Sequence, residues 1–206
     1  MKILLVHGLN RTSLSLINLE WHFQALGWQT EQFSYFAFIE SFNQISIRLR
    51  KHIRILANQG PYGIVAHSLG GLLIRAALGQ TNIHPPVHVV MLGTPNQSPR
   101  LAHLAWQLPP FQWLTGQCGF NLTQSNFFTT LPKLRSPYTI VAGNRGPRGR
   151  FSLFGDEAND GIVAVSETLL STSDRLIELP VEHTFMMNDV AVQASVVEAI
   201  KQSKQQ

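Results

Sequence analysis

The sequence contains little cysteine, little charge and no long apolar run. Its single cysteine, Cys118, allows no internal disulfide, and the absence of CxxC and HExxH patterns excludes the common zinc motifs. Charged residues make up 14% of the chain, well below the usual quarter, which indicates a partly apolar surface or site. No apolar run is long enough to span a bilayer. We therefore expect a core that needs no crosslink and no metal, with Cys118 as a small apolar filler.

The charge pattern limits the classes of partner. The net charge is +4, and the densest early basic run is at 48–54. This run has no interleaved aromatics and belongs to no nucleic-acid motif, so we interpret it as a solvated helix face. We expect no nucleic-acid partner, and a soluble, cytoplasmic protein because residues 1–7 enter a strand at once. The loop that contains Arg145, Arg148 and Arg150 is expected to be solvated, with its arginines paired to Asp156 and Glu157. The alternative hypothesis is that these arginines attract an anionic substrate or, transiently, a membrane surface.

Hydrophobic patterning predicts the fold class. The length of 206 residues fits one domain, and short apolar runs alternate with longer segments of helical period. The runs lack clean apolar–polar alternation, as strands buried on both faces do. We therefore predict an α/β chain with a mostly parallel central sheet and helices on both faces. The predicted strands are Lys2–Val6, Gln29–Tyr35, Gly63–Ala66, Val87–Leu92, Tyr138–Ala142 and Arg175–Leu179. The predicted helices span about 13–26, 40–58, 69–79, 162–170 and 188–203.

Residues 98–136 do not fit one strand–helix unit. The segment is rich in aromatics and is interrupted by proline and glycine. A long insertion of this kind is usually functional when it is not disordered, and its apolar content argues against disorder. We interpret it as a small cap over an apolar site. The side chains expected to line that site are Trp106, Phe111, Trp113, Phe127 and Phe128. The alternative is that these aromatics form core beneath a long loop.

The strongest chemical signal surrounds Ser68. A buried strand leads into Ala66, His67, Ser68, Leu69 and two glycines, and a helix follows. Such a strand–turn–helix places a serine hydroxyl above the sheet, with small residues two positions before and after it. Glycine usually occupies the first of these positions, and Ala66 replaces it here. The N-terminus of the following helix favours negative charge developing beside the serine. Ser68 is therefore the candidate nucleophile.

A nucleophilic serine needs a base and an acid, in the chain order serine, acid, histidine. His183 follows the last predicted strand and is the only histidine after position 103, so it is the candidate base. The acid is less constrained, because Asp156, Glu157, Asp160, Glu167 and Asp174 all precede His183. Asp160 is favoured because a loop turns beside it, and Asp156 is the main alternative. The remaining candidates of interest, His7 and His67, are expected to orient loops by hydrogen bonds.

Five short motifs carry a resemblance to a known family. They are His-Gly-Leu at 7–9, Ala-His-Ser-Leu-Gly-Gly at 66–71, Leu-Gly-Thr-Pro at 92–95, Asn-Asp-Gly-Ile-Val at 159–163 and Glu-His-Thr at 182–184. In this order they resemble the small bacterial serine lipases and esterases of the α/β-hydrolase superfamily that have an A-x-S-x-G elbow. The resemblance implies ester hydrolysis through an acyl-enzyme without a cofactor. It also implies an oxyanion hole formed by the backbone N–H groups of Leu9 and Leu69.

The sequence therefore predicts a serine hydrolase that cleaves carboxylic esters of small molecules. Lipid-like or aryl acyl esters are the expected substrates, because an apolar, aromatic-lined cleft binds such groups without leaving polar atoms unpaired. Three alternatives remain open. A thioesterase or acyltransferase would use the same three side chains, and a non-catalytic binding protein could share the fold. The third alternative is a structural role at a membrane surface. Acyl length, head group and oligomeric state are left undetermined.

Overall fold

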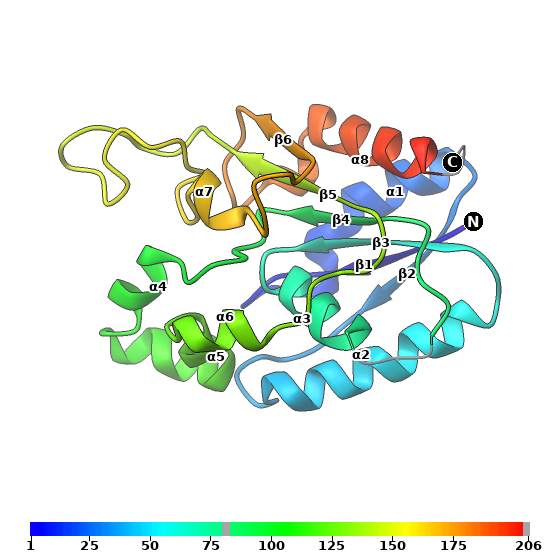
Figure 1. Ribbon diagram of the computed structural model, residues 1–206, viewed down its shortest axis with the longest axis horizontal. Coiled ribbons are helices and arrows are strands. Elements are labelled where there is room, and N and C mark those ends of the chain that lie inside the picture. Colours follow the sequence, from blue (N-terminus) through cyan, green and yellow to red (C-terminus); the bar gives the residue numbers. More distant parts are fainter. Residues whose placement is uncertain (80–82, 204–206) are drawn as a thin grey trace.

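A central β-sheet organises the fold. The structure is a computed structural model that describes residues 1–79 and 83–203. Its six strands are all parallel and lie in the order β2-β1-β3-β4-β5-β6 (Figure 1). The strands are β1 (Lys2–Val6), β2 (Gln29–Phe33), β3 (Tyr62–His67), β4 (Val89–Leu92), β5 (Tyr138–Gly143) and β6 (Leu176–Leu179). The predicted fold class and all six strands are confirmed, with ends shifted by one or two residues.

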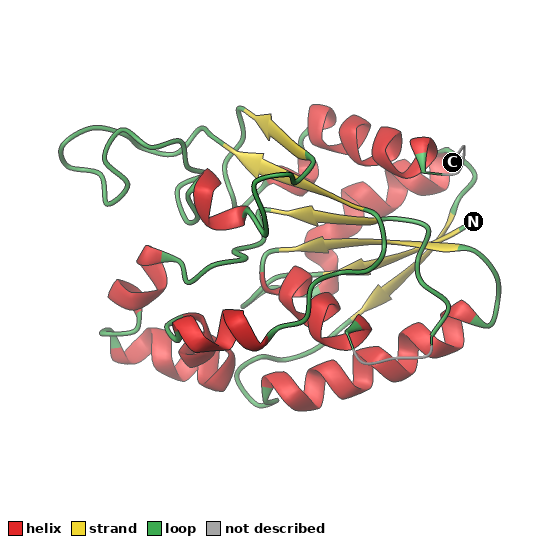
Figure 2. Cartoon of the chain, viewed as in Figure 1, coloured by secondary structure: helices red, strands yellow, loops and turns green. Residues whose placement is uncertain are grey.

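Helices cover both faces of the sheet, as Figure 2 shows. The α-helices are α1 (Ile17–Ala25), α2 (Phe42–Ala57), α3 (Leu69–Leu78), α4 (Arg100–Ala105), α5 (Pro109–Leu122), α6 (Ser125–Thr130), α7 (Val165–Thr168) and α8 (Val190–Gln202). Two short 3-10 helices, η1 (Ser13–Leu16) and η2 (Met186–Asn188), complete the described elements. The five predicted helices are present. The one predicted at 162–170 is only four residues long, because the backbone N–H groups of residues 162–164 bind carboxylates instead.

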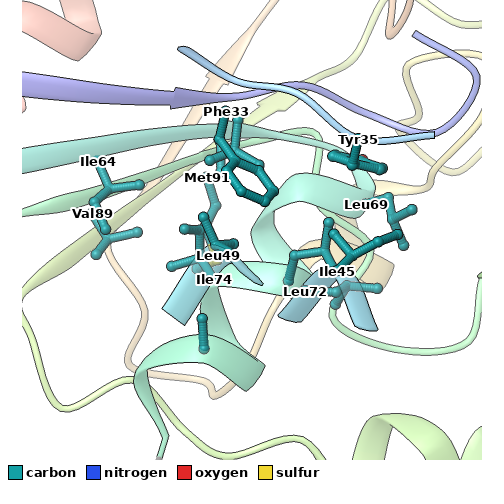
Figure 3. Packing of buried hydrophobic residues seen from close by; sticks show 14 of the residues in the cluster. Phe33, Tyr35, Ile45, Leu49, Ile64, Leu69, Leu72, Ile74, Val89 and Met91 are labelled. Atoms are coloured by element: carbon teal, nitrogen blue, oxygen red, sulfur yellow. The ribbon is translucent and has the colours of Figure 1, made fainter. Parts of the chain in front are cut away.

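Two apolar clusters form the core, one on each face of the sheet. On one face α2 and α3 pack against side chains of β1, β3 and β4, including Ile64, Val89 and Met91 (Figure 3). On the other face α1 and α8 pack against Leu5, Val65 and related side chains. Because successive strand residues point to opposite faces, the continuous apolar runs supply both clusters at once.

Local sequence explains why α2 forms where it does. Ser41 caps its N-terminus by accepting a hydrogen bond from the Gln44 N–H, and the Gln44 side chain accepts one from the Ser41 N–H. This reciprocal capping box fixes the start of the helix. Ile45, Leu49 and Ile53 then recur at helical spacing and are fully buried against the sheet. The neighbouring Cys118 is also buried, which raises its thiol pKa to about 12 and leaves it as an apolar filler.

The segment 98–136 folds as three helices at the carboxyl end of the sheet. In Figure 1, α4, α5 and α6 lie together on the side toward which the strand arrows point. Helix α5 is kinked at Gly116, whose φ of 51° is in the left-handed region that favours glycine. A Cβ at this position would lie 3.2 Å from the Ala37 carbonyl oxygen, so the kink also lets α5 approach the 36–38 loop closely.

Among the described residues, no helix combines the length and apolar character that crossing a bilayer requires.

Candidate active site

Ser68 occupies a strained turn between β3 and α3. Its φ of 51° and ψ of −121° lie outside the usual regions for a residue with a side chain. The turn is held on both sides, because the Ser68 N–H donates to the Leu92 carbonyl at 2.8 Å and the Ser68 carbonyl accepts from the Gly71 N–H at 3.0 Å. This conformation lifts the hydroxyl above the carboxyl end of the sheet.

Small residues flank Ser68 for a steric reason. A Cβ at Gly70 would lie only 2.6 Å from the Val6 carbonyl oxygen and 2.7 Å from that of His7, so only glycine fits there. Ala66, two residues before the serine, is completely buried in β3 and its methyl group is accommodated. The departure from glycine at position 66 thus leaves the turn intact.

Hydrogen bonds join Ser68, His183 and Asp160 into one chain. The His183 Nε2 lies 3.0 Å from the Ser68 Oγ, and its Nδ1 lies 2.7 Å from the Asp160 Oδ2. The other Asp160 oxygen, Oδ1, accepts from the N–H groups of Ile162 and Val163 at 3.0 and 2.7 Å. Asp160 is 2% exposed and His183 5%. A carboxylate so placed holds the imidazole with its proton on Nδ1, which leaves Nε2 to accept the serine proton.

The other candidate acids take no part in the hydrogen-bond chain of Ser68 and His183. Asp156 is exposed, and Glu157 forms an ion pair with Arg100 at 2.6 Å. Asp174 accepts from the Tyr138 hydroxyl at 2.6 Å. Gly93, directly after β4, leaves room for the hydrogen bond between His183 and Asp160. A Cβ at Gly93 would lie 3.0 Å from the His183 Nδ1 and 3.2 Å from the Asp160 Oδ2.

Two other buried histidines position these loops. The His67 Nε2 donates to the His183 carbonyl at 3.0 Å, while the His183 N–H donates to the Asp160 carbonyl at 2.9 Å. The His183 backbone is thereby fixed at both polar groups. Burial, with the charge of His183 as a smaller cause, holds the His67 pKa well below 6.5, so His67 is neutral. His7 stacks on Tyr35 at 4.2 Å and lies 2.9 Å from the Gly8 carbonyl through Nδ1.

The two predicted oxyanion donors, the N–H groups of Leu69 and Leu9, come from different elements near Ser68. Leu69 is the first residue of α3, so its N–H has no partner within the helix. Leu9 lines the same cavity as Ser68, in the loop after β1. Gly8 is needed in that loop, because a Cβ there would lie 2.8 Å from the His67 Nδ1.

A cavity of about 200 Å³ opens at Ser68 and His183. Loop residues form one side of it. Most of the remaining lining is apolar and comes from the start of the 98–136 segment and from α5. That segment supplies Pro99, Leu101, Ala102, Ala105, Phe111 and Leu122, and the loops after β4 and β5 add the apolar residues Pro95, Ile162 and Val163. The arrangement suits an uncharged carbon chain attached to a reacting carbonyl.

The structure differs from the sequence expectation for four of the five predicted substrate-binding aromatics, since only Phe111 lines the cavity. Trp113 is 77% exposed, and Trp106 packs against Phe111 and Phe120. Phe127 packs on Phe42 at 4.9 Å, and Phe128 is buried in the core. Aromatic content identified the segment, but the side of each helix that faces the cavity depends on packing. The smaller residues Leu101, Ala102 and Ala105 were missed, although their spacing marks one face of α4.

The similarity of this chain to known proteins lies in its structure. No family model matches the sequence, and no curated protein matches it. A metagenomic carboxyl esterase superposes with a TM-score of 0.68 at 16% identity, covering 100% of this chain and 76% of that one. An extracellular α/β-hydrolase from a Paenibacillus species gives a TM-score of 0.62 at 14% identity, covering 98% of both chains. The chain has the α/β-hydrolase fold.

A third structure with this fold has a different named activity. The thioesterase RedJ of the prodiginine biosynthetic pathway in Streptomyces coelicolor gives a TM-score of 0.62 at 10% identity, covering 98% of this chain and 90% of that one. In this α/β-hydrolase fold the loops after β1, β3, β5 and β6 meet at the carboxyl end of the sheet, which is where ligands bind in open α/β sheets.

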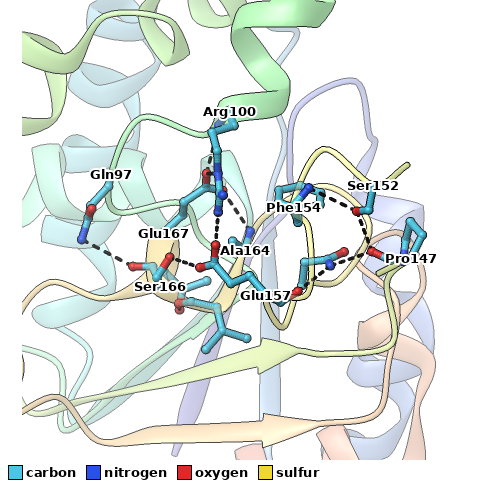
Figure 4. A network of polar contacts seen from close by, with 12 residues as sticks. Gln97, Arg100, Pro147, Ser152, Phe154, Glu157, Ala164, Ser166 and Glu167 are labelled. Atoms are coloured by element: carbon cyan, nitrogen blue, oxygen red, sulfur yellow. Dashed lines mark hydrogen bonds and ion pairs between the residues drawn. The ribbon is translucent and has the colours of Figure 1, made fainter. Parts of the chain in front are cut away.

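An ionic network joins the 98–136 segment to the Asp160 loop of this α/β-hydrolase fold (Figure 4). Arg100, at the start of α4, pairs with Glu157 at 2.6 Å and with the buried Glu167 at 2.8 Å. Glu167 also accepts from the Ala164 N–H at 2.9 Å, and Ser166 donates to Glu157. The Ser166 and Arg100 hydrogen bonds lower the Glu157 pKa despite some burial. Arg100 therefore links α4 to the loop that holds Asp160.

The arginine-rich loop does not make the ion pairs expected of a solvated loop, and its attraction for an anionic substrate or surface stays a prediction. Arg148 donates to the Asn144 carbonyl at 3.1 Å, and Arg150 lies over the Phe151 ring at 4.9 Å. None of the three arginines pairs with Asp156 or Glu157 within the described chain, and none lines the cavity. Within the described ranges 1–79 and 83–203, no cluster of three or more His, Cys, Asp or Glu side chains could hold a metal.

Proposed function

We propose that this protein hydrolyses carboxylic esters through an acyl-enzyme on Ser68. One observation carries the proposal, namely the unbroken hydrogen-bond chain from the Ser68 Oγ through His183 to the buried Asp160, which opens onto an apolar cavity. A serine hydroxyl is a weak nucleophile until an adjacent base accepts its proton. The fold is shared with an esterase and a thioesterase, which supports acyl transfer to water as the reaction class.

The proposed reaction has two balanced halves. The Ser68 Oγ attacks the ester carbonyl while His183 Nε2 takes its proton, and Asp160 stabilises the resulting imidazolium. The N–H groups of Leu9 and Leu69 stabilise the oxyanion. His183 then gives the proton to the departing alkoxide, which leaves as an alcohol. In the second half water attacks the acyl carbonyl while His183 Nε2 takes its proton, the bond between the acyl carbon and the Ser68 Oγ breaks, His183 returns the proton to the Ser68 Oγ, and the carboxylic acid leaves.

We also propose that α4 and α5 act as a cap that selects the acyl group. The cavity volume of about 200 Å³ is below the range of drug-sized pockets, which favours short and medium acyl chains over long ones. Exposed apolar side chains on the outside of α5, Trp113 and Leu114, support lipid-like esters as the natural class.

Product analysis tests the proposal. Wild-type protein is incubated with para-nitrophenyl butyrate and with a matched butyryl thioester, each with and without added alcohol. Ser68→Ala is assayed beside it, and Ser195→Ala is the matched control for that substitution. The expected result is release of butyric acid and para-nitrophenol from the oxygen ester. Turnover of the thioester alone would assign a thioesterase, butyryl transfer to the alcohol an acyltransferase, and no turnover a binding protein.

A further inference from the structure

Arg11 is a cation in the lining of the cavity that holds Ser68 and His183. It follows Leu9 and Asn10 in the loop after β1. Asn10 has a φ of 52° and, with Ser68, is one of two non-glycine residues of the described chain with positive φ. Asparagine tolerates this left-handed conformation better than most residues. The loop therefore holds an unusual conformation at the point where Arg11 enters the lining.

No carboxylate of the described chain forms an ion pair with Arg11. Three other arginines of the described chain have ionic or hydrogen-bonding partners. Arg48 pairs with Glu40, Arg100 pairs with Glu157 and Glu167, and Arg75 donates to the carbonyl groups of Leu131 and Pro132. Arg11 is thus a cation that remains available to a ligand.

The surroundings favour an anion at this position. No acidic residue of the described chain lines the cavity, and Asp160 lies behind His183 with both oxygens hydrogen-bonded. The charge of Arg11 reaches the site, because it contributes to lowering the pKa of the neighbouring His67. An apolar lining around one unpaired guanidinium strengthens its attraction for an oxyanion, since little water competes.

Arg11 also lines a second hollow, which shares Asn10 and Arg11 with the first. Tyr35, Phe36, Phe38 and Leu114 line this hollow together with Asn10 and Arg11. Phe36 and Phe38 are 52% and 56% exposed. Arg11 therefore lies between two apolar recesses, of which only the first contains Ser68.

We infer that Arg11 binds a carboxylate or phosphate group of the substrate, so that the preferred ester carries an anionic group a few bonds from its scissile carbonyl. This inference rests on the proposed ester hydrolysis. The planar guanidinium matches either anion through paired hydrogen bonds. The acyl chain then occupies the cavity beside α4 and α5, and any further apolar part of the molecule extends toward Phe36 and Phe38.

The test compares esters that share one acyl group and differ in charge. The substrates are para-butyryloxybenzoate, para-butyryloxyphenyl phosphate and the neutral para-butyryloxybenzamide. The variants are Arg11→Gln, which removes the charge, and Arg11→Lys, which keeps it. Arg54→Gln is the matched control, because Arg54 is exposed on α2 and lies outside the cavity lining.

For wild type we expect a higher kcat/KM for at least one anionic ester than for the neutral one. Arg11→Gln should lower that kcat/KM about tenfold to a hundredfold more than it lowers the neutral value, since hydrogen bonds between charged groups are the strong ones. Arg11→Lys should retain part of the preference, and Arg54→Gln all of it. The larger loss, on carboxylate or on phosphate, identifies the natural anion.

The outcomes separate this inference from the proposed function. Hydrolysis of the neutral ester with no anionic preference, or equal losses on all three esters in Arg11→Gln, would overturn the role of Arg11 and leave the hydrolase standing. No hydrolysis of any ester by wild type would overturn the proposed function, and the inference with it.

Discussion

The two walls of the cavity at Ser68 are built in different ways. One wall consists of the loops that follow β1, β3, β5 and β6, where Ser68, Asp160 and His183 are fixed by backbone hydrogen bonds. The other wall consists of α4 and α5, whose cavity-lining side chains are held by apolar packing. Hydrogen bonds fix direction and distance, whereas apolar packing fixes volume. The loop wall therefore suits chemistry, and the helical wall suits selection among acyl groups.

The first prediction breaks the loop wall at its centre. Ser68→Ala should lower kcat on a butyrate ester by roughly 10⁵-fold or more, because removing the nucleophile of a serine triad leaves only oxyanion stabilisation and binding. Its thermal midpoint should stay close to that of wild type, since the strained turn keeps its backbone partners. Steady-state kinetics and a thermal melt measure both. Retention of a tenth of wild-type turnover would remove Ser68 from the mechanism.

The second prediction separates the two candidate acids. Asp160→Asn should lower kcat about 10⁴-fold, by analogy with the serine protease in which this change was measured, because an amide stabilises the wrong imidazole tautomer. Asp156→Asn, at an exposed loop position, should change kcat less than tenfold. The same kinetic assay on both variants decides between them, and a reversed order would assign the acid to Asp156.

The third prediction addresses the helical wall. Phe111→Ala should lower the ratio of kcat/KM for octanoate over acetate about tenfold, because each buried methylene contributes about 0.8 kcal/mol. Trp113→Ala, two residues away but largely exposed, should leave that ratio within about twofold. Kinetics across an ester series measure it. Equal effects of the two substitutions would mean that α5 does not select the acyl chain.

The fourth prediction concerns the link between the walls. Arg100→Gln removes the one charged donor to the buried Glu167 carboxylate that is described, and leaves it the backbone N–H groups of residue 100 and Ala164. Arg100 is 41% exposed, so we expect a modest loss of about 1–2 kcal/mol of unfolding free energy. That corresponds to a fall of about 2–8 °C in thermal midpoint, whereas Arg54→Gln should shift it little. An unchanged midpoint in Arg100→Gln would show that apolar packing alone holds α4.

The fifth and smallest effect lies far from both walls. Burial, helped by the charge of Arg175, lowers the His88 pKa from 6.5 to about 4. Between these values the unfolded state binds a proton that the folded state does not, so stability falls as pH drops from about 6.5 toward 4. His88→Gln should reduce this fall by on the order of 1 kcal/mol. Thermal melts between pH 7 and pH 4.5 measure it, and an identical slope in the variant would contradict the assignment.

The loop wall was predictable from sequence because short-range geometry is encoded in short motifs. The glycine at position 70 and the strand–serine–helix order predict the Ser68 turn, and the turn at Gly161 favours Asp160. The helical wall was not predictable to the same depth. Aromatic content indicated that residues 98–136 border a site, but Trp106, Phe127 and Phe128 pack against other helices or the core. Which face of a short helix meets a cavity depends on tertiary packing, which a single sequence does not specify. Arg11 carried no motif and was identified only from its position in the lining.

The central claim is that Ser68 is an activated nucleophile, and covalent labelling tests it most directly. An alkyl fluorophosphonate is incubated with wild type, Ser68→Ala and Ser195→Ala, and intact mass is measured. His183→Gln is labelled in the same way. We expect one adduct on wild type and on Ser195→Ala, none on Ser68→Ala, and a strongly slowed reaction on His183→Gln. An adduct on Ser68→Ala at the wild-type rate, or an unlabelled wild type, would contradict it.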